Sequence, residues 1–226
     1  MFEAPFLGFA PAAFKWFDGI EANNTKEWFT DNRATFEAEV KEPLNRLLNE
    51  LAAELGGTTK VFRQNRDIRF SKDKRPYKTN TYGVVSGIGS GTFGLYVSIN
   101  ATRVLCGTGE YDMAKDQLDR FRKAIADPES GDAFVEAYQA VEEAGISIEG
   151  EALKTAPRGY PKDHPRIEHL RRKQLLMMNY LPKAQAKGRA PFEHALSTWR
   201  AAQPMVAWLS EHVGESEVPP EARFRR

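Results

Sequence analysis

The cationic side chains of this sequence concentrate between residues 60 and 78, where eight lysines and arginines stand against two carboxylates. The cations are Lys60, Arg63, Arg66, Arg69, Lys72, Lys74, Arg75 and Lys78. Guanidinium groups bind carboxylates and phosphates in bidentate geometry, and several cations together neutralise a ligand that carries more than one negative charge. The stretch therefore predicts a site that binds an anion.

Hydroxyl and aromatic side chains of the same stretch would complete such a site. Ser71 and Thr79 carry hydroxyl donors, and Tyr77 offers a ring for stacking. The predicted ligand-binding residues here are Arg66, Arg69, Ser71, Lys72, Lys74, Tyr77 and Lys78. The alternative is a surface hairpin whose arginines pair with acidic side chains of the preceding helix. Those acids are Glu37, Glu39, Glu42, Glu50 and Glu54.

A second basic segment, residues 156–165, contains three prolines. Because prolines stiffen a loop, less ordering is required when a ligand binds. We expect Arg158 and Tyr160 to bind the ligand from this loop, and we hypothesise that the loop faces the same cleft as residues 69–78. The alternative is a structural crossover whose tyrosine packs on the sheet.

No reaction follows from these residues, although Asp67, Asp73 and His164 are weak acid–base candidates. Because Asp67 and Asp73 lie among cations, we expect them to orient arginines rather than to bind a metal ion. No cysteine cluster or His-x-x-x-His pattern indicates a metal site, and the sequence identifies no cofactor. The single cysteine, Cys106, lies in an apolar run and is expected to be a buried small residue.

The chain has 226 residues, of which 41% are hydrophobic and 28% are charged, as in ordinary globular proteins. Its net charge of +1 hides an asymmetry, since residues 60–80 carry +6, residues 154–173 carry +5 and the remainder carries −10. Two basic segments on an acidic body indicate a focused positive field. No apolar run approaches the ~18 residues of a membrane span. We expect no signal peptide, because the N-terminus lacks a basic region followed by a long apolar one. We predict a cytoplasmic protein, since a single cysteine suits a reducing compartment.

The N-terminal quarter shows apolar residues at helical spacing. Asn24 is the predicted N-cap of the second helix, with Glu27 completing a capping-box pattern, and Pro43 is predicted to split the long apolar run. The expected helices cover residues 11–21, 25–41 and 43–55.

Apolar and polar residues alternate in the middle of the chain, which is typical of strands. The expected strands cover residues 60–64, 67–71, 82–86, 93–100 and 102–107. In the second of these, Ile68 and Phe70 would face the core, while Asp67, Arg69 and Ser71 would face the opposite side. This arrangement would present a row of polar groups to a ligand.

The second half is mostly helical, with a loop over residues 146–166 and an ambiguous segment at residues 175–181. Asp112 is the predicted cap of its first helix. The expected helices cover residues 112–126, 131–144, 166–174, 191–202 and 203–213. We therefore predict one α+β domain over residues 1–213, followed by a polar tail, residues 214–226. An antiparallel or mixed sheet from about residues 60–107 would be packed by the N- and C-terminal helices.

Three groups of motifs resemble those of one protein family. They are Asn23-Asn24 with Trp28-Phe29 and Asn32-Arg33; Arg66 to Lys74 with Pro76 to Thr79; and Leu153-Lys154 with Pro157 to Pro161 and Asp163 to Pro165. Over roughly residues 6–212, the chain is similar to the uncharacterised family catalogued as domain of unknown function 2461. The resemblance implies a single-domain cytosolic protein and supplies no activity.

We favour the recognition of a phosphate-bearing or polycarboxylate small ligand, because the acidic remainder of the chain would repel a nucleic acid. A second hypothesis is a nucleic-acid binding module, whose affinity would fall steeply with salt. A third is a protein-interaction domain that docks an acidic partner. Arg33 is a marginal site residue, which could instead pair with the Asp67 face. Whether the protein is an enzyme, and its oligomeric state, are left open.

Overall fold

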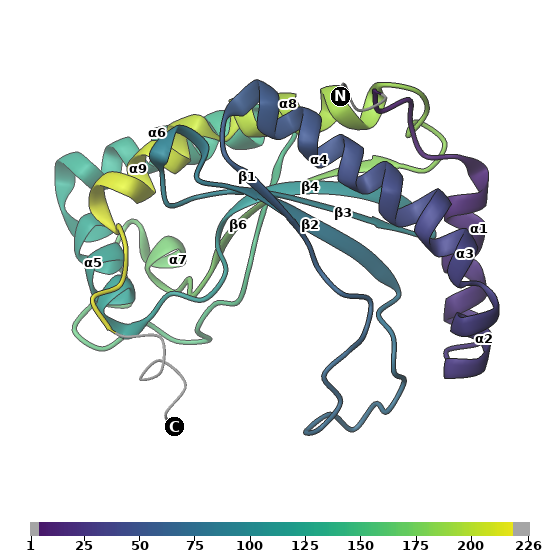
Figure 1. Cartoon of the computed structure of the whole chain (residues 1–226). Helices are drawn as coiled ribbons and strands as arrows, with labels where there is room; N and C mark the ends of the chain where they lie inside the picture. The colour runs from purple at the N-terminus through teal and green to yellow at the C-terminus, as the bar shows by residue number, and fades with distance from the viewer. Residues whose placement is uncertain (1–4, 219–226) are drawn as a thin grey trace. The chain divides into compact units, whose positions relative to one another are not determined.

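The computed structural model describes residues 5–218 (Figure 1). These residues form two compact units. Unit 1 comprises residues 5–90, 94–106 and 180–197, and unit 2 comprises residues 91–93, 107–179 and 198–218. The architecture is α+β, as predicted, with helices that flank an antiparallel sheet. None of the helices in this part of the chain is long and apolar enough to cross a membrane. The single domain over residues 1–213 stays a prediction.

Six strands form the sheet, in the order β1-β2-β3-β4-β6-β5. They are β1 Thr58–Val61, β2 Asn80–Ser86, β3 Leu95–Asn100, β4 Arg103–Glu110, β5 Ser147–Glu149 and β6 Leu175–Pro182. The pairs β1–β2, β2–β3 and β5–β6 are antiparallel. The sheet predicted near residues 60–107 is confirmed by β1 to β4, and β6 shows that the ambiguous segment is a strand. Strand β5 lies in a region where we expected a loop.

Unit 1 packs its strands against α4, Glu42–Leu55, which contacts β1 and β2 (Figure 1). The leucines that gave this segment its helical period are fully buried; they are Leu44, Leu47, Leu48 and Leu51. Burying one such side chain stabilises a fold by about 1.5–3 kcal/mol. Gly83 of β2 permits the close approach, because a Cβ there would lie 2.8 Å from the carbonyl oxygen of Lys60 and against Leu48.

The helix expected over residues 25–41 is divided in the structure. The N-terminal helices are α1 Pro11–Ala22, α2 Lys26–Asp31, α3 Arg33–Thr35 and the π-helix η1 Phe36–Lys41. Pro43 lies in the first turn of α4, where its missing N–H is harmless. The N-cap prediction was wrong by one residue, since the hydroxyl of Thr25 accepts from the amide of Trp28 at 3.2 Å. Asn24 makes a different contact.

The strand predicted at residues 67–71 is absent from the structure, and β1 ends at Val61. Phe70, predicted to face the core, is 97% exposed. The Asp67 carboxylate accepts from the amide of Arg69 at 3.2 Å, and the amide of Ser71 donates to the carbonyl of Ile68 at 3.3 Å. Such local side-chain and turn bonds compete with a strand ladder, which explains the wrong prediction.

The second half adds α5 Lys115–Ala126, α6 Pro128–Glu143, α7 Ile167–Leu170, α8 Ala190–Ala201 and α9 Gln203–His212. Helix α5 begins after Ala114, so the cap predicted at Asp112 was wrong. In unit 2, the rings of Phe134 and Trp208 meet edge to face at 4.8 Å. Cys106 is fully buried, as predicted, and burial raises the pKa of its thiol.

Arg166 joins the end of α5 to the start of α6 in unit 2. Its Nε donates to the carbonyl of Ile125 at 2.7 Å, and Nη2 donates to the carbonyl of Asp127 at 2.9 Å. Nη1 forms an ion pair with Asp132. One guanidinium therefore satisfies carbonyls that a helix end leaves without partners.

The first residues of the predicted polar tail contact α5. Gln117 donates to the carbonyl of Gly214 at 2.9 Å, and the carboxylate of Asp116 accepts from the hydroxyl of Ser216 at 2.8 Å and from the amide of Glu217 at 2.9 Å. The rest of that prediction, residues 219–226, lies outside the described residues.

Candidate functional site

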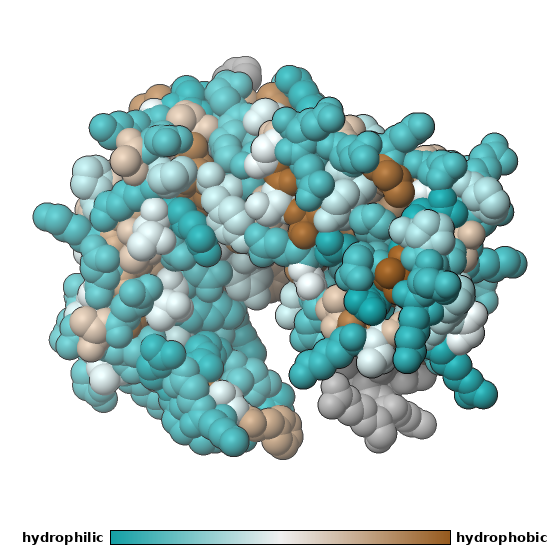
Figure 2. Space-filling view, turned by 180° about the vertical axis from the view of Figure 1, so that it is seen from behind, coloured by the Kyte–Doolittle hydropathy of each residue, from teal (hydrophilic) through white to brown (hydrophobic). Residues whose placement is uncertain are grey.

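Residues 62–79, which we call the arm, connect β1 to β2 and project away from the sheet within unit 1 (Figure 1). The amide of Lys78 donates to the carbonyl of Gln64 at 2.9 Å, and the amide of Arg66 donates to the carbonyl of Pro76 at 2.8 Å. Figure 2 shows the arm from behind, at the lower left, with a largely hydrophilic surface. The arm is therefore a hydrogen-bonded extension of the β1–β2 pair, and it carries most of the predicted ligand-binding residues.

A buried amide fixes the base of the arm. The side chain of Gln64 donates to the carbonyls of Lys78 at 2.6 Å and Asn80 at 3.2 Å. It also accepts from the hydroxyl of Thr81 at 2.7 Å. Because a buried amide without partners is costly, these bonds specify one conformation for the chain that enters and leaves the arm.

Asn24 attaches the arm to the turn between α1 and α2. Its Oδ1 accepts from the amide of Tyr77 at 3.0 Å, and its Nδ2 donates to the carbonyl of Tyr77 at 3.1 Å. The Tyr77 ring stacks on Phe29 with centroids 4.2 Å apart. Tyr77 is buried, so its first role is to hold the arm, and one ring face is not available to a ligand.

The carboxylates of the arm pair with arginines two residues further along the chain. Asp67 accepts from Arg69 at 2.6 Å, and Asp73 accepts from Arg75 at 2.7 Å and from Arg66 at 2.8 Å. The prediction that both aspartates orient arginines is therefore confirmed. The arginines bind acids of their own loop, not those of the preceding helix, and Arg33 is not the partner of Asp67.

These contacts also bear on acid–base chemistry. The hydrogen bonds from Arg69 lower the pKa of Asp67 to about 2 from its ordinary value of 3.8. Hydrogen bonds from Arg75, and then from Arg66, lower the pKa of Asp73. A carboxylate whose pKa is lowered far below neutral pH is a weak proton acceptor, which argues against either residue as a general base.

The lysines of the arm differ in their surroundings. Lys78 donates to the carbonyl of Arg63 at 2.6 Å and lies 4.6 Å from the centroid of the Tyr82 ring. Desolvation lowers the pKa of Lys78, and the charge of Arg63 lowers it further. Lys74 donates to a backbone carbonyl at 3.0 Å. Lys72 is exposed, and its side chain makes no ion pair or hydrogen bond with the described residues.

A cavity of about 280 Å³, which we call the arm cavity, opens on this element. Its lining residues are Arg66, Asp73, Arg75, Tyr77, Lys78, Thr79 and Asn80. Three of the predicted ligand-binding residues thus come together around it, namely Arg66, Tyr77 and Lys78. Arg69, Lys72 and Lys74 lie elsewhere on the arm, and the hydroxyl of Ser71 lies 3.5 Å from the guanidinium of Arg66. Sequence reasoning missed Arg75 as a lining residue.

The second predicted loop belongs to unit 2. Arg158 is exposed, and Tyr160 is partly buried, which raises the pKa of its phenol. The Nδ1 of His164 accepts from the amide of Arg166 at 3.0 Å, so this histidine has a structural role at the start of α7. The hypothesis that this loop and the arm share a cleft stays a prediction. Within residues 5–218, no cluster of three or more histidine, cysteine or acidic residues could hold a metal ion.

A family model described as "Conserved hypothetical protein (DUF2461)" matches residues 12–208. Because the match covers more than half of the chain, this protein belongs to that family, as the motifs around the arm had suggested. A comparison with curated proteins finds no match. The family is uncharacterised, so any function must be argued from the site itself.

Proposed function

We propose that this protein binds a small phosphate-bearing or polycarboxylate ligand at the arm, with the anionic group in the arm cavity. The observation that carries the proposal is the composition of that cavity. Three cationic side chains, those of Arg66, Arg75 and Lys78, surround it together with the single carboxylate of Asp73. An excess of fixed positive charge in a partly desolvated concavity favours an anion.

The state of Lys78 supports the proposal. Its ammonium is partly desolvated and lies near the charge of Arg63, and both conditions lower its pKa. A bound anion would oppose the lowering of the Lys78 pKa, because an opposite charge a few Å away favours the protonated amine. Binding should therefore raise the pKa of Lys78.

The arginines are already oriented before a ligand arrives. Asp73 receives hydrogen bonds from both Arg66 and Arg75, which restricts the two guanidinium groups. Side chains that are held in place lose less entropy on binding. With a volume of about 280 Å³, the cavity suits a phosphate or pyrophosphate group, and the rest of a larger ligand would lie outside. Arg158 and Tyr160 would contact that outer part if their loop faces the arm.

A thermal-shift titration with pyrophosphate, inorganic phosphate and citrate tests the proposal. A ligand at 100 times its dissociation constant should stabilise the protein by about 2.7 kcal/mol. Arg75→Gln should reduce the stabilisation, whereas Lys72→Gln, which removes the same charge from outside the cavity lining, should leave it nearly intact. Equal effects of the two variants, or no shift with any of the three anions, would refute a specific cavity site.

A second candidate function, nucleic-acid binding, is favoured by Phe70. This ring is 97% exposed on the arm, and the guanidinium of Arg69 lies 6.0 Å from its centroid. Proteins that bind single strands combine cations along the backbone with exposed aromatic rings on which bases stack. This function predicts that Phe70→Ala weakens oligonucleotide binding and that affinity falls steeply with salt. Pyrophosphate binding would be unchanged in the same variant.

We also propose a cytoplasmic location. The single cysteine, Cys106, is buried and suits a reducing compartment.

A further inference from the structure

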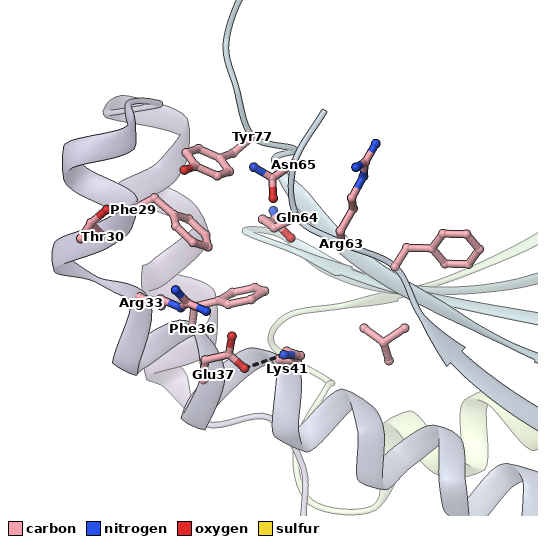
Figure 3. A pocket seen from close by; sticks show the side chains of 12 residues that line it. Phe29, Thr30, Arg33, Phe36, Glu37, Lys41, Arg63, Gln64, Asn65 and Tyr77 are labelled. Carbon is pink, nitrogen blue, oxygen red and sulfur yellow. Dashed lines mark hydrogen bonds and ion pairs between the residues drawn. The ribbon is translucent and has the colours of Figure 1, made fainter. Parts of the chain in front are cut away.

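A larger cavity, of about 540 Å³, lies within unit 1 between the helices α2 to η1 and the start of the arm (Figure 3). We call it the helix-side cavity. Its helix wall includes Phe29, Arg33 and Phe36, and its opposite wall includes Arg63 and Asn65. None of these five residues is among the ligand-binding residues predicted from the sequence. Arg33 was kept apart from them, as a marginal site residue. The volume falls in the range of ~300–1,000 Å³ that is usual for small-molecule sites.

The helix wall presents Phe29, Arg33, Glu37 and Lys41, which follow one another at intervals of four residues. In a continuous α-helix, each such step passes a full turn by about 40°, so the last side chain would rotate away from the first. The π-helix η1, Phe36–Lys41, takes about one residue more per turn and keeps Glu37 and Lys41 on the cavity side. Short π-helical turns are frequent at functional sites.

Two guanidinium groups of this cavity have no ion-pair partner among the described residues. The charge of Arg63 does act on Asp67 of the arm, whose pKa it lowers. Glu37 and Lys41 neutralise each other in an ion pair of 2.7 Å. Arg33 and Arg63 are exposed, and neither side chain forms an ion pair or hydrogen bond with the residues that the structure describes. They come from opposite walls, as Figure 3 shows. In the arm cavity, by contrast, Arg66 and Arg75 both pair with Asp73.

Aromatic rings supply the apolar part of the lining. Phe36 is buried, while Phe29 and Phe62 are partly exposed. Asn65, which is exposed, adds an amide that can donate or accept. Guanidinium groups beside apolar rings match a ligand that has both a negatively charged group and an apolar body. A free inorganic anion would leave the rings unused.

We infer that the helix-side cavity binds a small organic anion, a carboxylate or phosphate monoester with an apolar body, through Arg33 and Arg63. The rings of Phe29, Phe36 and Phe62 contact the apolar body of this ligand. The Glu37–Lys41 ion pair forms the bottom of the cavity. The two cavities share only Tyr77 in their linings, and neither Arg33 nor Arg63 lines the arm cavity. Either site can therefore fail without the other.

Calorimetric titration of the full chain with phenyl phosphate and benzoate tests this inference. Inorganic phosphate and benzyl alcohol serve as ligands that lack the apolar body or the charge. We expect phenyl phosphate to bind more tightly than inorganic phosphate, and benzyl alcohol to bind least. Arg33→Gln should weaken phenyl phosphate binding by about tenfold or more, since charge-assisted hydrogen bonds are the strong ones.

Two variants separate this site from its surroundings and from the arm. Lys26→Gln removes an exposed cation from α2, outside the cavity lining, and should leave phenyl phosphate binding unchanged. Arg75→Gln should remove any binding in the arm cavity and leave unchanged the phenyl phosphate binding that depends on Arg33. The inference is overturned if neither aromatic anion binds, if Arg33→Gln and Lys26→Gln behave alike, or if Arg75→Gln alone abolishes binding. It is also overturned if, in the Arg75→Gln variant, inorganic phosphate binds as tightly as phenyl phosphate.

Discussion

Replacing Asn24 with alanine should loosen the base of the arm, because it removes both hydrogen bonds to the backbone of Tyr77. These bonds are 3.0 and 3.1 Å long and span 53 residues of sequence. A net hydrogen bond contributes about 0.5–1.5 kcal/mol, so the pair should contribute about 1–3 kcal/mol to the local stability of the arm. The Phe29–Tyr77 stacking would remain as the other contact at this point.

Amide hydrogen exchange measures this effect directly. The Tyr77 amide donates to Asn24, so its protection reports the opening of that bond. A loss of about 1–3 kcal/mol corresponds to a fall in protection of roughly 5- to 150-fold. Amides of α4, which are held by the buried leucines, should keep their protection.

Two further variants control this experiment. Asn23→Ala removes only a 3.3 Å hydrogen bond to the carbonyl of Gly19, and should leave Tyr77 exchange unchanged. Asn24→Asp keeps an acceptor for the Tyr77 amide but places a carboxylate oxygen against the Tyr77 carbonyl. It should therefore also lose protection. Equal Tyr77 exchange in Asn24→Ala and Asn23→Ala would show that the Asn24 side chain does not hold the arm at Tyr77.

Three other predictions concern single contacts. Arg166→Met should destabilise the protein by about 2–4 kcal/mol in urea unfolding, because it leaves helix-end carbonyls and an aspartate without their donor. Gly83→Ala should cost about 1–3 kcal/mol in the same assay, because its Cβ would overlap the strand pair and α4. Asp67 should titrate near pH 2 by NMR, and Arg69→Ala should move its pKa towards 3.8. Since the folded pKa is lowered, the stabilisation from this pair is complete above pH 3.8 and is lost as the pH falls towards 2.

Periodicity predicted the elements whose side chains are buried on one face. The leucines of α4 follow the helical spacing, and four of the five are fully buried, while Leu55 at the end of the helix is partly exposed. In β3, Leu95, Val97 and Ile99 alternate with other residues and are fully buried. In both elements the apolar positions of the pattern are the positions that the fold buries, so the sequence was sufficient to predict the element.

The arm shows where that reasoning ends. Residues 67–71 alternate like a strand, yet no partner strand reaches them, and Asp67 bonds instead to Arg69. Phe70 is exposed for the same reason. A hydrophobic residue indicates the core only when a neighbouring element covers it, and a single sequence does not show which segments meet.

The candidate sites depend on contacts that are distant in sequence. Asn24 looked like a cap because the local pattern fits one, and only the fold reveals Tyr77 as its partner. Arg33 lies four residues from both Phe29 and Glu37, and this spacing was the available signal for the helix-side cavity. The π-helix that aligns the later residues has no comparable sequence rule.

The most direct test of the account is calorimetric titration of the full-length protein with pyrophosphate at alkaline pH, in two buffers of different ionisation enthalpy. Such a pair of buffers reports protons taken up on binding. We expect binding with proton uptake, because the anion should raise the lowered pKa of Lys78, and we expect the uptake to be lost in Lys78→Gln. An anion site in the arm cavity would be contradicted if pyrophosphate does not bind. It would also be contradicted if pyrophosphate binds without proton uptake and binds equally well to Lys78→Gln.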